Sequence, residues 1–350
     1  MKRIDERDTM FARMSLKKGT RQYEDYYSRN KDKKALDDEI RERPNICGPG
    51  TATYSEVNSP IADANFLFLE DIRKFSEGEI NPNKVDVSKE EMTKKLKGLT
   101  LHYGAALVGI CDMKDYHYYS HRGRHAEVYG EEVYSEKHKW GIIFAVEMDK
   151  EMLNRSPQLA EVIETSNIYV KAGIIGMQLS YYIRLLGYDA RNHMDANFLA
   201  VLPLVARDAG IGEIGRNGIL TTKEYGSMVR LGLVTTELEL IPDKPKEFGL
   251  QRFCELCGLC SKTCPGKAIP IDDKKNIDGH LRWQIVQENC YGIWRNIGTD
   301  CGICISSCPF SQGVTEELID SDEKIQEILE SHKEKYKVRP YIREAPEWLK

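Results

Sequence analysis

Eight of the ten cysteines in this 350-residue chain lie between residues 254 and 308, and this clustering limits what the chain can fold around. They form two motifs that each end in Cys-Pro, namely Cys254-x2-Cys257-x2-Cys260-x3-Cys264-Pro265 and Cys290-x10-Cys301-x2-Cys304-x3-Cys308-Pro309. This spacing is typical of proteins that bind two [4Fe–4S] clusters, in which the last cysteine of each motif ligates the cluster of the other motif. We therefore predict crossed ligation, with one cluster on Cys254, Cys257, Cys260 and Cys308 and the other on Cys264, Cys290, Cys301 and Cys304.

Two other uses of clustered cysteines fit the sequence less well. A disulfide framework suits a small secreted domain, whereas this chain is long and shows no secretory signal. Zinc also binds CxxC pairs, but it would need only four of these residues and would not call for the Cys-Pro endings. The remaining two cysteines, Cys47 and Cys111, are solitary, and we expect them to be ordinary reduced thiols.

Charge and hydropathy argue against two further classes of protein. The net charge is −5, and no block of Lys and Arg with interleaved aromatic residues is present, so nucleic-acid binding has little support. The longest apolar stretches, such as residues 140–146, are too short to span a bilayer. The sequence as given has no twin-arginine or secretory signal, which predicts a cytoplasmic protein, or an exported and membrane-associated one if a signal was removed.

Composition and periodicity divide the chain into four predicted parts. Residues 1–60 are polar and punctuated by Pro and Gly, which predicts an arm with short helices, with disorder as the alternative. Residues 61–245 alternate helical and strand-like patterns, which predicts an α/β (α+β) core. A cysteine-rich module at 246–315 and a charged helix and tail at 316–350 follow. The predicted helices are 66–75, 89–97 (ending at Gly98), 166–186 and 320–337; a buried segment lies at 198–206, and the strand-length runs are 105–111, 140–147 and 231–237.

One stretch, residues 210–215, fits the GxGxxG spacing of dinucleotide-binding proteins. Its context is poor, because Pro203 interrupts the preceding segment and Asn217-Gly218 would break a helix just after the third glycine. A dinucleotide site therefore has weak support, and no phosphate loop of the GxxxxGK type is present.

Around the same glycines the sequence resembles the cobalamin-dependent reductive dehalogenases and, more distantly, the epoxyqueuosine reductases. The resemblance is densest at 209–210, 218–220, 224–226 and 229–231, and it continues from Phe253-Cys254 through both cysteine motifs to Phe310. The helical stretch 169–187 also fits, and residues 5–13 are similar to the mature start of the respiratory, exported members. The chain lacks a twin-arginine signal and the long extensions of the largest cytoplasmic members.

The resemblance implies a nitroreductase-like cobalamin domain joined to a ferredoxin-like module with two [4Fe–4S] clusters. The family holds its corrinoid base-off, with no protein ligand to cobalt. In agreement, no Asp-x-His-x-x-Gly motif is complete, the near misses being Asp115-x-His117 and Asp278-x-His280. Backbone amides and small residues of the glycine-rich loop at 210–218 would hold the cobalamin. The alternative is that this loop is a plain turn between two elements. The expected contacts are Gly210, Gly212, Gly215, Asn217, Gly218, Ile219, Leu220 and Ser227.

The resemblance also implies three catalytic residues. Tyr169 matches the tyrosine that donates a proton, Arg230 matches its basic partner, and Asn197 matches an active-site asparagine. A phenol with a pKa near 10 is a weak acid, and a nearby guanidinium favours its anion and so makes donation easier. The alternative roles are a core residue for Tyr169, a structural ion pair for Arg230 and a helix cap for Asn197. Lys171 is a further catalytic candidate.

These observations predict an oxidoreductase that replaces a carbon–halogen bond with a carbon–hydrogen bond in a small organohalide. We expect a low-potential electron donor as its partner and leave a homodimer open. The first alternative is an epoxyqueuosine-reductase-like enzyme acting on tRNA, with an aspartate such as Asp195 as the acid; the acidic net charge weighs against it. The second is a non-catalytic electron-transfer protein whose α/β domain docks a partner.

Overall fold

A four-stranded antiparallel sheet forms the centre of the protein in this computed structural model, which describes residues 1–277, 279–316, 318, 321–335 and 343–350. The strand order is β1 (Leu107–Asp112), β2 (Trp140–Glu147), β6 (Val229–Thr236) and β3 (Ala190–His193). The predicted strand 140–147 is confirmed to the residue. Residues of β2 alternate between two cores: Ile142 and Phe144 face one core cluster, and Ile143 and Ala145 face the other. The sheet is therefore buried on both faces.

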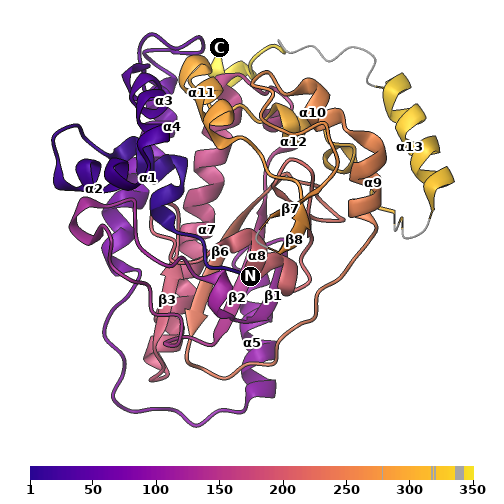
Figure 1. The fold of residues 1–350 in the computed structure, drawn as a ribbon. Helices are drawn as coiled ribbons and strands as arrows, with labels where there is room; N and C mark the ends of the chain where they lie inside the picture. Colours follow the sequence, from indigo (N-terminus) through magenta and orange to yellow (C-terminus); the bar gives the residue numbers. More distant parts are fainter. Residues whose placement is uncertain (278, 317, 319–320, 336–342) are drawn as a thin grey trace.

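The long helix α7 (Leu159–Leu185) covers one face of the sheet, and the short helix α8 (Leu202–Asp208) covers the other (Figure 1). Glycines let α7 approach the sheet closely, because a Cβ at Gly176 would overlap the side-chain amide of Asn192 in β3. The Asn192 Nδ2 atom donates to the Gly173 carbonyl at 3.0 Å, which fixes the helix against the strand. This contact positions the α7 side chains that face the start of β6.

Three helix predictions differ from the structure in their ends. Helix α4 (Ser59–Ile72) begins seven residues before the predicted 66 and ends three residues before the predicted 75. Helix α5 (Lys89–His102) continues through Gly98 instead of ending there, because Leu96 and Thr100 are buried against the core and the chain turns only at Gly104. Helix α7 begins seven residues earlier than the predicted 166, and Gly187 follows its end in the left-handed conformation. Helices α4 (Ser59–Ile72) and α6 (Lys150–Leu153) pack beside α7.

The N-terminal arm is helical and tied to the cysteine-rich part of the chain. It contains α1 (Met10–Ser15), α2 (Arg21–Arg29) and α3 (Lys31–Glu42). The fully buried Arg13 pairs with Asp37 of α3 and donates to Glu288 Oε1 of α11 (Gln287–Ile297) at 2.6 Å. A buried charge needs such partners, so this network fixes the arm onto α11.

The cysteine-rich part follows β6 and packs around short helices at one end of the sheet (Figure 1). Its elements are α9 (Leu250–Cys257), α10 (Leu259–Thr263), β7 (Lys275–Ile277), β8 (His280–Arg282), α11, α12 (Ile303–Ser306) and α13 (Asp322–Lys335). Helix α13 packs on α9 through the buried Ile325 and Leu329, which share a core cluster with Phe253 and Phe310. The two-stranded β4 (Glu213–Ile214) and β5 (Leu220–Thr221) lie against α9 and α8.

Short 3-10 helices complete the secondary structure: η1 (Glu6–Asp8), η2 (Arg73–Phe75), η3 (Asp115–His117), η4 (Ala126–Val128), η5 (Phe310–Gln312) and η6 (Glu347–Leu349). Asp278 of the second incomplete cobalt-ligand motif and both ends of the predicted helix 320–337 lie outside the described residues. In the described part of the chain, every helix is too short or too polar to cross a bilayer.

Candidate functional site

The first motif and the last cysteine of the second motif meet around one cavity. Cys254, Cys257, Cys260 and Cys308 all line a space of about 360 Å³, which includes its opening to solvent. Gly258, in the left-handed conformation, makes the turn between α9 and α10 that brings Cys257 and Cys260 to the same side. This is the set of four thiols that the crossed pattern predicts for one cluster.

The other four cysteines form a second group beside the first. Burial raises the pKa of Cys290 to about 11, and the neighbouring Cys264 adds to the shift. Burial likewise raises the pKa of Cys304 well above its usual range, with Cys301, Cys290, Cys260 and Cys264 as electrostatic neighbours. Cys304 therefore lies close to Cys260 of the first group as well as to its own.

The cysteine groups are more open than a site for a single ion. Among the residues that the structure describes, no three His, Cys, Asp or Glu side chains gather closely enough to hold one metal ion. A [4Fe–4S] cubane occupies the space between its four cysteines, whereas zinc binds its ligands directly at about 2.3 Å. The donor set and the cavity thus suit a cubane.

Arg216 organises the first cysteine group, and no motif in the sequence pointed to it. Its side chain is buried, with Nε donating to the Cys254 carbonyl at 3.1 Å. Nη1 donates to the carbonyls of Pro270, Ile271 and Asp272 at 2.9–3.1 Å. The position beside the glycine-rich loop was the only hint of its role.

The structure gives most residues of the glycine-rich loop a role in their own packing. A Cβ at Gly210 would overlap the Lys244 carbonyl, and one at Gly212 would overlap the Thr221 carbonyl. Gly215 and Asn217 line the cavity of the first cysteine group, and Leu220 is buried in the core. Ser227 Oγ pairs with Thr221 Oγ1 at 2.8 Å. Of the eight predicted contacts, Gly218 is exposed, Gly210 and Ile219 are half-buried, and the other five are buried.

Tyr169 and Arg230 come together next to the loop that carries Cys301 of the second cysteine group. Tyr169 lies on α7, and Arg230 lies at the start of β6 opposite Val146, so that its side chain points toward α7. The guanidinium carbon of Arg230 lies 5.3 Å from the centroid of the Tyr169 ring. Arg230 Nη2 also donates to Thr165 Oγ1 at 2.8 Å and to Asp300 Oδ2 at 2.9 Å.

Burial keeps the Tyr169 phenol neutral, and its hydroxyl has no hydrogen-bond partner among the described residues. Burial raises its pKa to about 12; Arg230 and Arg124 lower the pKa, whereas Asp195 and Asp300 raise it. The ring is half-buried, and within the described part of the chain the hydroxyl forms no hydrogen bond. With no partner in the described part of the protein, this hydroxyl is available to an incoming molecule.

Asn197 has a structural environment. Arg191 Nη2 donates to the Asn197 Oδ1 atom at 2.8 Å and to its carbonyl at 3.2 Å, and Asn197 Nδ2 donates to Ser76 Oγ at 3.0 Å. It does not cap a helix, since α8 is preceded by Val201. The neighbouring Asp195 acts electrostatically on the phenol, and it pairs with Arg124 at 3.8 Å.

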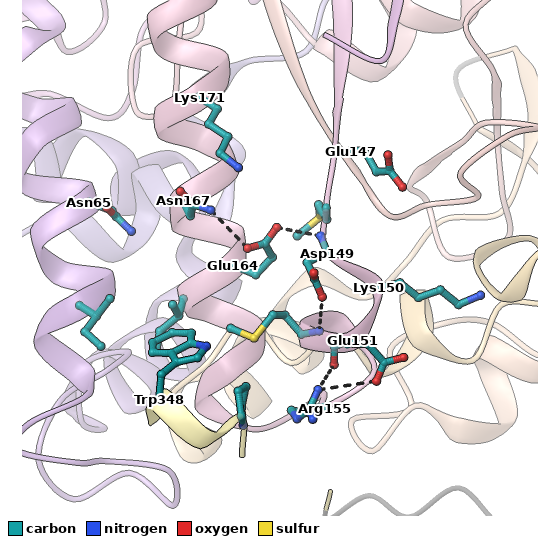
Figure 2. Close-up of a pocket in the computed structure, with 15 residues that line it drawn as sticks. Asn65, Glu147, Asp149, Lys150, Glu151, Arg155, Glu164, Asn167, Lys171 and Trp348 are labelled. Carbon is teal, nitrogen blue, oxygen red and sulfur yellow. Dashed lines mark hydrogen bonds and ion pairs between the residues drawn. The ribbon is translucent and has the colours of Figure 1, made fainter. Parts of the chain in front are cut away.

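A larger cavity lies on a different face of α7 (Figure 2). Glu164, Asn167 and Lys171 point into it, while Thr165 and Tyr169 lie one turn apart on the other face. Its volume is about 1670 Å³ including the open mouth, and Trp348 closes one side. Lys171, the further candidate from the sequence, is therefore separated from the phenol by the helix.

Comparison with known proteins gives a consistent relationship. Residues 253–312 match the family model of the 4Fe-4S dicluster domain. The chain is 35% identical over 179 residues to the tetrachloroethene reductive dehalogenase of Sulfurospirillum multivorans, covering 49% of this chain and 35% of that protein. It is 30% identical over 271 residues to that of Desulfitobacterium hafniense, covering 64% and 49%. The chain thus spans half or less of the length of these relatives.

Solved structures agree on the fold. A catabolic reductive dehalogenase in complex with 3-bromo-4-hydroxybenzoic acid superposes with a TM-score of 0.79 at 21% identity, over 97% of this chain and 47% of that one. The epoxyqueuosine reductase of Lactococcus garvieae is 34% identical over only 115 residues, 31% of this chain and 32% of that protein. The predicted α+β core with a ferredoxin-like dicluster module is confirmed, and the chain is similar to reductive dehalogenases over half or less of their length.

Proposed function

We propose that this protein is a cobalamin- and iron–sulfur-dependent reductase that replaces a carbon–halogen bond with a carbon–hydrogen bond in a small organohalide. One observation carries the proposal: a half-buried phenol without a hydrogen-bond partner lies under a guanidinium, beside two groups of four cysteines. The reaction consumes two electrons and one proton and releases a halide ion. The cysteine groups suit the electron supply, and the phenol suits the proton supply.

The electron path in this proposal uses both cysteine groups. Cys254, Cys257, Cys260 and Cys308 would hold one cluster and Cys264, Cys290, Cys301 and Cys304 the other, as the cavity lining and the electrostatic neighbours support. Because Cys260 is an electrostatic neighbour of Cys304, clusters held by the two groups would lie within short range of each other. A low-potential donor would deliver electrons to the cluster nearer the surface.

Cobalamin, when bound, would supply a strongly reducing cobalt centre for cleavage of the carbon–halogen bond. The free phenol of Tyr169 and the free surface of Gly218 and Ile219 fit such a ligand. The whole loop is the proposed contact region, with Gly210, Gly218 and Ile219 as its accessible part and the other five residues as its support. A reductive dehalogenase structure with a TM-score of 0.75 and 21% identity to this chain is described as suggesting a mechanism for B12-dependent dehalogenation.

Tyr169 would deliver the proton to the product carbon. Its raised pKa keeps the phenol protonated until the carbon needs the proton, because burial disfavours the tyrosinate. Arg230 then stabilises the anion that forms, since its guanidinium already lies against the ring. A positioned acid of this kind contributes roughly 10²- to 10⁴-fold to a rate. Asn197 would act at a distance, by ordering the segment that carries Asp195.

One observation keeps an aspartate acid as a second candidate. Asp195 interacts electrostatically with Tyr169 and is only 18% exposed, so it lies near the same site. An epoxyqueuosine-reductase-like enzyme would use such a residue in place of the phenol. Comparing Asp195→Asn with Tyr169→Phe on both substrate classes decides between them, because only the residue that donates the proton costs a large part of the rate.

The direct test is anaerobic reconstitution of the full chain with iron, sulfide and cobalamin. We expect about eight iron atoms per chain, the EPR signals of two clusters, one bound corrinoid and release of halide from an organohalide. Iron for two clusters without any corrinoid would contradict the proposal and leave an electron-transfer protein. Size-exclusion chromatography and cell fractionation test the homodimer and the cytoplasmic location that the proposal includes.

A further inference from the structure

Glu161 is a buried acid on the same face of α7 as the proposed proton donor. Glu161, Thr165 and Tyr169 occupy successive turns of the helix, and the Glu161 side chain is fully buried. Thr165 Oγ1 lies 3.2 Å from Glu161 Oε1 and accepts a hydrogen bond from Arg230. The Thr165 hydroxyl therefore connects the Glu161 carboxyl group to the Arg230 guanidinium.

A second acid, Asp300, completes the network from a distant part of the chain. The carboxyl groups of Glu161 and Asp300 lie close enough to interact, yet Glu161 Oε2 and Asp300 Oδ1 have no partner among the described residues when both groups are carboxylates. Protonation of Glu161 removes this conflict, because its Oε2–H can then donate to Asp300 Oδ1. Burial and the Asp300 charge both raise the pKa of Glu161, in agreement with a neutral acid.

Asp300 sits on a loop that is pressed against α7. A side chain at Gly302 would come within 2.8 Å of Glu161 Cγ, so the loop passes the helix where only glycine fits. Thr299 Oγ1 donates to the Pro157 carbonyl at 2.8 Å and accepts from Cys301 N at 3.2 Å. The loop that leads into Cys301 is thus fixed to the start of α7, with the Asp300 carboxylate aimed at Arg230.

We propose that Asp300, steadied by Glu161, is a positioning residue that holds the Arg230 guanidinium against the Tyr169 ring. This inference rests on the proposed function, in which Tyr169 donates the proton. It adds that the loop at 299–302, which carries Cys301, also sets the position of the Arg230 guanidinium beside the phenol. Arg230 and Asp300 are only 12% and 14% exposed, so the contact is shielded from solvent and held in one place.

Charged groups from four segments face Tyr169, and they define the signs of the expected effects. Arg230 from β6 and Arg124 lower the pKa of the phenol, whereas Asp195 and Asp300 raise it. Arg230 has the largest influence among these four. Losing the Asp300 charge alone should lower the pKa of Tyr169, but displacing Arg230 should raise it by more than that.

The test measures the titration of the phenol itself. A fluorinated tyrosine at position 169 of the whole 350-residue chain, loaded with iron and cobalamin, is titrated by fluorine NMR. Fluorination lowers the pKa of the phenol, so the titration is complete at a pH at which the protein stays folded. The variants are Asp300→Asn, Glu161→Gln and the double variant Glu161→Gln/Asp300→Ala. The matched control is Asp322→Asn, which breaks an exposed ion pair with Arg252 far from the site.

The variants should separate positioning from a simple charge effect. Asp300→Asn should lower the pKa of residue 169 by about half a unit or more, because the amide oxygen still accepts from Arg230. Glu161→Gln should change it little, because the amide NH₂ can still donate to Asp300 Oδ1. The double variant, which leaves no anchor for Arg230 among these carboxyl groups, should raise it by about half a unit or more.

Two results overturn the inference. In the first, all variants titrate like Asp322→Asn, and in the second the double variant lowers the pKa as Asp300→Asn does. Neither result depends on turnover, so the failure of the proposed function is recognised separately. Absence of bound corrinoid or of halide release contradicts the function, whereas normal turnover with an unresponsive phenol contradicts only the role of Asp300.

Discussion

The first cysteine group and the Tyr169 site differ in how their polar groups are paired. Around Cys254 the pairing is dense, with Arg216 alone satisfying four backbone carbonyls. Around Tyr169 the phenol, Arg230 Nε and Asp300 Oδ1 lack partners among the described residues. Full pairing gives a rigid frame, and unpaired groups remain free for a ligand or a proton. Changes in the first region should therefore cost iron and stability, and changes in the second should cost turnover alone.

The largest effect should come from breaking the crossed cysteine pairing. Cys308→Ser should lower the iron content by about half and abolish turnover, because it removes a ligand of the cluster held mainly by the first motif. EPR of the reduced protein should lose the signal that the Cys254→Ser variant also loses. Cys264→Ser is the matched control and should remove the other signal. If Cys308→Ser and Cys304→Ser lose the same cluster, the pairing is not crossed.

Tyr169→Phe should have the next largest effect and leave the frame intact. Turnover should fall by about 10²- to 10⁴-fold, because the variant lacks the proton donor. Iron content and melting temperature should stay at wild-type values, since the hydroxyl makes no hydrogen bond to the described part of the protein. Tyr181→Phe serves as the control, because Tyr181 is 47% exposed and stacks on Arg184 away from the site. Unchanged turnover would remove Tyr169 from the mechanism.

Arg216→Lys should affect the frame more than the chemistry. A lysine cannot reproduce the planar set of donors, so at least two of the four carbonyls lose their partner. The free energy of unfolding should fall by about 2–3 kcal/mol, with iron lost more readily to a chelator. Arg252→Lys, on an exposed ion pair, should cost less than about 1 kcal/mol. Equal losses in the two variants would show that the pairing around Cys254 contributes no special rigidity.

The same contrast explains how much could be predicted from sequence. Cysteine spacing is local, so both cluster motifs could be identified directly, and the β-branched run at 140–147 predicted its strand to the residue. Resemblance gave Tyr169 and Arg230, which the fold brings together. Arg216 belongs to no recognisable pattern, because its partners lie 38 to 56 residues away.

Glu161 and Asp300 could not be found for a related reason. They lie 139 positions apart in the sequence, and only the docking of the loop at 299–302 onto α7 brings them together. The glycine-rich loop shows the opposite case. Its small residues suggested a ligand cradle, which stays a prediction, and the structure gives Gly210 and Gly212 a further role, because they let backbone segments of this chain pass close to one another.

The smallest effect should come from Lys171→Ala, which tests where the boundary of the reactive site lies. Lys171 is exposed and points into the open cavity beside Glu164 and Asn167 (Figure 2). Helical periodicity places Tyr169 on another face of α7. Turnover should remain within about twofold of wild type, because a solvated cation one helix diameter away acts weakly on the phenol. Steady-state kinetics with an organohalide gives the measurement. A loss of tenfold or more would place substrate in the cavity, and the unpaired phenol would then be a feature of packing and not of the reaction.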